Sequence, residues 1–135
     1  MRCDVLHTAL KTFPQELGTG VPYSSKTGLY CMIGWIGQCG EDAGIREDTY
    51  RSTDPSGNRF YEIAKQVFGG DDVFACRVSE TFIQANDQFK GTSEKQALAM
   101  KRMLATFIKE NCPSRLARLP LIGRVFGTRL RAGVR

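Results

Sequence analysis

The chain has 135 residues, of which 41% are hydrophobic and 24% charged, a composition typical of one folded domain of common size. A chain of this length folds without a stabilising metal or disulfide. The longest apolar run, the eight residues from Leu29 to Ile36, is far shorter than the ~20 residues of a membrane span. The first residues lack the apolar stretch of a signal peptide, and five cysteines are too few for a disulfide scaffold. These features predict a cytoplasmic protein with reduced thiols.

The net charge of +5 is unevenly distributed along the chain. Residues 1–111 contain 13 Lys and Arg against 14 Asp and Glu, whereas residues 112–135 contain six arginines and no acid. The arginines are Arg115, Arg118, Arg124, Arg129, Arg131 and Arg135. This pattern predicts a helical domain over residues 1–112 and an Arg-rich, partly apolar segment over residues 113–135. Such a segment is typical of an arm that binds an acidic partner, although it can also be a solubilising end.

Hydrophobic periodicity predicts five helices and no internal repeat. In chain order they cover residues 3–13, 27–40, 60–68, 74–86 and 93–111. Pro14 ends the first helix. The second is apolar on every side, with Thr27 as its expected cap and Gly40 as its expected end. Its glycines Gly34 and Gly37 lack side chains and so let another element approach closely.

The later helices have clearer boundaries. Gly69-Gly70 closes the third, and Asp71-Asp72 is expected to cap the fourth. Residues 73–78 also fit a strand, but the apolar spacing favours a helix. Ser93 and Gln96 form a predicted capping box at the start of the fifth. The expected fold is all-α: a single-domain orthogonal bundle of about five helices around a central apolar helix.

Few residues are candidates for catalysis or for metal binding. Cys31, expected near the start of the second helix, is the best candidate nucleophile, and His7, the chain's single histidine, is its only possible imidazole base. A buried structural cysteine is the alternative. The Cys and His spacings do not fit a zinc site, and no calcium or phosphate-loop pattern occurs, so we expect no metal and no cofactor.

Two motifs give the chain a resemblance. The first is Gly28-x-x-Cys31-x-x-Gly34, and the second is Asn86-Asp87 followed by Thr92-x-Glu94 before the last helix. The chain thereby resembles an uncharacterised domain-of-unknown-function family of small actinobacterial and phage proteins. The resemblance implies a bacterial or phage origin and an intracellular setting, and it supplies no activity.

Two positions depart from the family pattern, because Trp35 replaces a small residue and Ala85 replaces a large one. A reciprocal exchange of size predicts that these two side chains lie in contact or one side chain apart, and coincidence is the alternative. Asn86 and Asp87 have two interpretations, as capping or turn residues between helices or as part of a ligand site.

Three functional hypotheses follow. The first is a small non-enzymatic binding protein, an accessory or inhibitor protein of a phage or mobile element, whose Arg-rich segment engages nucleic acid or a nucleoprotein. The second is a thiol-dependent hydrolase that uses Cys31 and His7. The third is a structural or oligomer-forming protein that binds itself or another protein.

Overall fold

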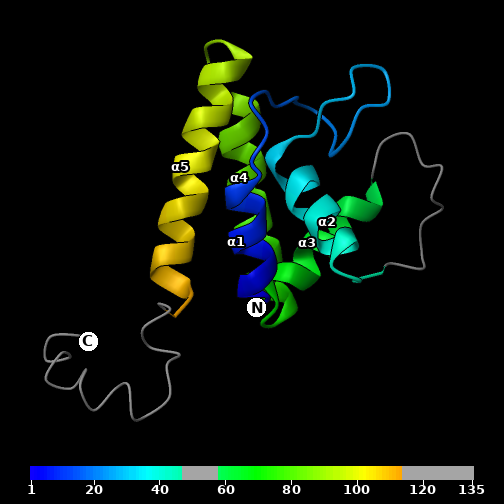
Figure 1. Cartoon of the computed structure of the whole chain (residues 1–135), viewed down its shortest axis with the longest axis vertical. Coiled ribbons are helices and arrows are strands. Elements are labelled where there is room, and N and C mark those ends of the chain that lie inside the picture. The colour runs from blue at the N-terminus through cyan, green and yellow to red at the C-terminus, as the bar shows by residue number, and fades with distance from the viewer. Residues whose placement is uncertain (47–57, 114–135) are drawn as a thin grey trace, which may run out of the picture. The chain divides into compact units, whose positions relative to one another are not determined.

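The computed structural model describes residues 1–46 and 58–113, whose helices are shown in Figure 1. The helices are α1 (Cys3–Lys11), α2 (Met32–Asp42), α3 (Asn58–Phe68), α4 (Asp72–Gln88) and α5 (Ser93–Asn111). The described residues contain no strand, only an isolated antiparallel bridge between Tyr23 and Tyr30. The predicted all-α class and the prediction of five helices are therefore confirmed.

The chain divides into two compact units, Met1–Ala105 and Thr106–Arg135. Helices α1 to α4 and most of α5 belong to the first unit, and the last residues of α5 belong to the second. The predicted division at residue 112 stays a prediction, because the six arginines that motivate it lie outside the described residues.

Helix α2 is the centre of the first unit. It packs against α1, α3 and α4, and Met32, Ile33 and Ile36 on it are 0% exposed. In Figure 1 it lies beside α3. The aliphatic side chains of α2 are thus removed from water, which is the main favourable term in folding. This confirms the prediction of a central apolar helix.

Two glycines of α2 allow its closest contacts. A Cβ atom on Gly34 would collide with the backbone carbonyl of Pro22, and one on Gly37 would collide with the backbone carbonyl of Phe60. The expectation that these glycines admit a neighbouring element is confirmed. Gly37 in particular lets the backbones of α2 and α3 touch.

The start of α2 differs from the prediction of a helix over residues 27–40. Gly28 has a φ of +72°, which interrupts a right-handed helix, and the Thr27 hydroxyl accepts a hydrogen bond from Leu29 N within the preceding turn. Cys31 is the actual N-cap, with its Sγ accepting from Gly34 N at 3.4 Å. The helix also continues past Gly40 to Asp42. A continuous apolar run therefore combines a half-buried turn, Leu29 and Tyr30, with a buried helix.

The other boundaries follow backbone chemistry. Asp71 caps α4 by accepting from Phe74 N at 2.7 Å, as predicted, and residues 73–78 are helical. Gly69 and Gly70 end α3 at positive φ, also as predicted. The capping box is wrong by one residue, because Thr92 caps α5 by accepting from Lys95 N. The first helix ends two residues earlier than predicted, at Lys11.

Trp35 lies on α2, half-buried. Its Nε1 donates to the backbone carbonyl of Ala9 at 3.1 Å, and its ring meets that of Tyr30 edge-on with centroids 5.5 Å apart. These two contacts attach the indole to α1 and to the turn before α2. Contact with Ala85 stays a prediction.

Candidate functional site

Asn86 is a fully buried polar residue, 0% exposed, near the end of α4. Its Oδ1 accepts from Met32 N at 3.1 Å, and its Nδ2 donates to the carbonyl of Gly18 at 2.9 Å. Its own backbone carbonyl accepts from Gln96 Nε2 at 2.7 Å. One amide therefore satisfies backbone groups of α2 and of the loop before it, while its backbone binds α5. Buried backbone groups require such partners.

Asp87 extends this network to the surface. The carboxylate is exposed, and its Oδ1 accepts from Gly20 N at 3.3 Å and from Asn86 Nδ2 at 3.1 Å. The pair Asn86-Asp87 thus holds the 18–20 loop against the N-terminus of α2. Both residues satisfy backbone groups, but these groups belong to residues more than 50 positions earlier in the chain and not to a turn between α4 and α5.

Asp87 and Cys31 both line a cavity of about 160 Å³. The complete lining is Gly20, Val21, Pro22, Cys31, Ile33, Asn58, Tyr61, Ile83 and Asp87. The structure therefore brings Cys31 close to a carboxylate, which was not anticipated. No imidazole lines this cavity.

The chemistry of the cavity is unfavourable for a nucleophile. Cys31 is 5% exposed, and burial raises the pKa of its thiol to about 11, with the nearby Asp87 charge acting in the same direction. The backbone amides at the start of α2 lower the pKa by less than burial raises it. The thiolate is the reactive form of cysteine, so the raised pKa works against nucleophilic attack by Cys31 at neutral pH.

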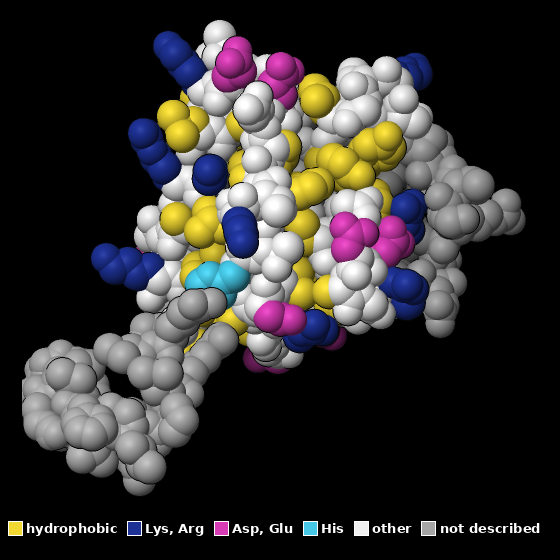
Figure 2. Space-filling view, in the orientation of Figure 1, with side chains coloured by type: hydrophobic (Ala, Val, Ile, Leu, Met, Phe, Trp, Pro, Cys, Tyr) yellow, Lys and Arg dark blue, Asp and Glu magenta, His cyan; other side chains and the backbone are white. Residues whose placement is uncertain are grey.

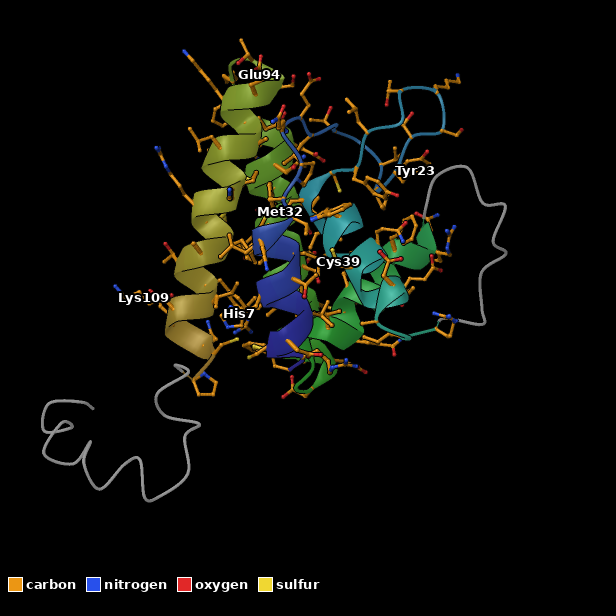
Figure 3. All side chains as sticks on the ribbon, viewed as in Figure 1. His7, Tyr23, Met32, Cys39, Glu94 and Lys109 are labelled. Carbon is orange, nitrogen blue, oxygen red and sulfur yellow. The ribbon has the colours of Figure 1, made fainter. Side chains whose placement is uncertain are left out.

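His7 lies on α1 and is exposed. Figure 3 shows it well apart from Met32, the residue that follows Cys31. The structure thus does not assemble the proposed pair of Cys31 and His7, and Cys31 makes its hydrogen bond with Gly34 instead.

Alkylation should distinguish the three free thiols. Cys31 and Cys39 are buried, with thiol pKa values raised to about 11 mainly by burial, whereas Cys76 is half-buried. We expect iodoacetamide at pH 7 to modify Cys76 first and to leave Cys31 unmodified over hours, as mass spectrometry of peptides measures. The same reagent in urea, which exposes all three thiols, is the control. Rapid modification of native Cys31 that a His7→Ala substitution slows would restore the hydrolase hypothesis.

Cys3 and Cys112 are disulfide-bonded. The expectation of reduced thiols is therefore wrong for these two residues. In the part of the chain that the structure describes, no group of three His, Cys, Asp or Glu side chains can hold a metal ion. None of the helices described over residues 1–46 and 58–113 has the length and apolar character needed to cross a membrane.

A cluster of cations occupies one face of α5. Figure 2 shows dark-blue Lys and Arg side chains along this helix, at the left of the molecule. We name as the α5 basic face the four exposed residues Lys95, Lys101, Arg102 and Lys109. No acid occurs between the first and the last of them, and Glu94 lies at the beginning of the helix. Leu98, 49% exposed, shares the face.

The α5 basic face makes no ion pair in the described part of the chain. The ion pairs there join Arg2 to Asp4, Arg59 to Glu41 and Lys65 to Glu62. The net charge of each segment does not reveal this face, because residues 1–111 are nearly neutral in sum. The helical spacing of the four cations was the signal that would have revealed it.

Comparison with known proteins finds no matching family model, no matching curated protein and no matching solved structure. The resemblance to the uncharacterised actinobacterial and phage family therefore stays a prediction.

Proposed function

We propose that this protein is a non-enzymatic helical binding protein that engages nucleic acid or a nucleoprotein through its Arg-rich segment, residues 113–135. The observation that carries the proposal is that residues 112–135, directly after α5, contain six arginines and no acid. Such a segment cannot neutralise itself. Arginine forms paired hydrogen bonds with phosphate oxygens, which makes a polyphosphate the best-fitting acidic partner.

The chemistry of the described residues supports a binding role over catalysis. Asn86 is occupied by backbone partners, and Cys31 is a buried thiol with a raised pKa. His7, the only candidate base for the hydrolase hypothesis, does not line the cavity that contains Cys31. These observations favour electrostatic binding over catalysis as the function of the chain. A role as an accessory or inhibitor protein of a phage or mobile element fits such binding.

Salt dependence tests this proposal. Each phosphate contact releases about one counterion, so four to six contacts predict at least ~100-fold weaker binding when salt rises fourfold. We expect this loss for the full chain and a labelled 24-base-pair DNA between 50 and 200 mM salt, measured by fluorescence anisotropy. A full-length variant with all six arginines replaced by glutamine should bind far more weakly at 50 mM salt.

The control retains the length of the chain and changes other cations. Lys26→Gln and Arg77→Gln alter two exposed cations on a loop and on α4, and should leave the affinity nearly unchanged. Equal affinity of the six-glutamine variant and the natural chain would refute a role for the Arg-rich segment.

A further inference from the structure

The α5 basic face is an unusual concentration of charge for this fold. The four cations of this face make no ion pair within the described residues, and no acid lies between the first and the last of them. Exposed cations on other elements, such as Lys26 and Arg77, also make no ion pair there, so the concentration on one helix is what distinguishes the face. Attraction to the negative C-terminus of the helix accounts for Lys109 in the last turn but not for Lys101 and Arg102 in the middle. The folding of the domain therefore does not explain the face.

We propose that the α5 basic face binds the sugar–phosphate backbone of double-stranded nucleic acid, as a second contact in addition to that of the Arg-rich segment. This inference rests on the proposed function and names residues of the folded domain that take part in it. The contact is electrostatic and independent of base sequence.

The dimensions of the face suit a phosphate backbone. At 1.5 Å per residue, Lys95 and Arg102, which both belong to the unit Met1–Ala105, lie about 10 Å apart along α5. Lys101 lies next to Arg102. Phosphates of one strand recur every ~3.4 Å along a duplex axis, so this length spans about three phosphates. Lysine and arginine reach them with long side chains whose stems lie on the helix.

The other side chains of the face favour a duplex over a single strand. Proteins that bind single strands stack the bases on exposed aromatic rings. The only aromatic residue of α5 is Phe107, which is half-buried, and the exposed residues between the cations are small or aliphatic. Gln96, the residue type that reads base edges, is buried and donates to the Asn86 carbonyl. The face thus offers charge without stacking or base recognition.

Charge reversal in the full-length chain tests the inference. Lys101→Glu with Arg102→Glu removes two contacts from the centre of the face. We expect binding to the 24-base-pair DNA to weaken about 50-fold at 0.1 M salt, and the slope of log affinity against log salt to fall by about 2. Lys26→Glu with Arg77→Glu changes the net charge equally on other elements, and should alter the affinity less than threefold. Circular dichroism checks that both variants remain helical.

Each outcome has a defined meaning. If the α5 reversal affects binding no more than its control, the inference fails while the proposed function stands. If the six-glutamine variant binds as well as the natural chain but the α5 reversal does not, the proposed role of the Arg-rich segment fails and the α5 contact stands. Tighter binding to a single strand of the same sequence, or to polyglutamate, would overturn the assignment to a duplex.

Discussion

Replacing Asn86 with alanine should lower the free energy of unfolding by about 3–5 kcal/mol. The substitution removes a side chain that is 0% exposed and takes the partner from two backbone groups, the buried Met32 N–H and the half-buried Gly18 carbonyl. An unsatisfied buried donor or acceptor costs about 1–3 kcal/mol, and truncation of a buried side chain adds the cost of the cavity that it leaves. The measurement is urea unfolding followed by circular dichroism.

Asp87→Ala is the matched control for Asn86→Ala, because the neighbouring residue belongs to the same network but is exposed. Water replaces the carboxylate at Gly20 N, so we expect a loss of about 1 kcal/mol or less. If both substitutions cost the same, or if Asn86→Ala costs under 1 kcal/mol, Asn86 is not the residue that joins α2, α4 and the 18–20 loop. That result would favour the interpretation of Asn86 as part of a ligand-binding site.

Local signals predicted the helices well where one residue type had one structural role. Gly69-Gly70 ended α3, because two consecutive positive φ angles require glycine, and Asp71 capped α4. At α5 the hydroxyl residues Thr92 and Ser93 are adjacent, and the spacing predicted Ser93 and Gln96 as the capping box. Gln96 instead donates to Asn86, a tertiary contact that local rules do not include.

The second helix shows why an apolar run is ambiguous. Leu29 and Tyr30 are as apolar as the residues that follow, yet they belong to the turn that Gly28 and the Tyr23–Tyr30 bridge create. The half-buried turn and the buried helix share a hydrophobic composition, so composition cannot locate Cys31 as the cap. The sequence also showed Asn86-Asp87 as a polar pair, but the partners Met32 and Gly18 lie more than 50 positions away.

Gly37→Ala should destabilise the protein by about 3 kcal/mol or more. The added Cβ would meet the backbone carbonyl of Phe60, which belongs to α3. A side chain can change rotamer to make room, but two packed helix backbones must move apart. Overpacking a well-packed core costs about 1–3 kcal/mol, and separating α2 from α3 adds lost contacts of Ile36 and Ile63, both 0% exposed. Thermal and urea unfolding measure the change.

Gly40→Ala, one turn later on α2, is the control that separates a clash with backbone from a clash with side chains. Its Cβ would meet methyl carbons of Ile63 and Val67 at 2.7 and 3.0 Å, which are side-chain atoms that can shift. Alanine also favours a helix over glycine by about 0.5–1 kcal/mol, in both variants equally. We therefore expect Gly40→Ala to cost about 1–2 kcal/mol and Gly37→Ala clearly more. If Gly37→Ala proves as stable as the natural chain, α2 and α3 do not touch backbone to backbone at Phe60, and the packing at the centre of the bundle is looser than described.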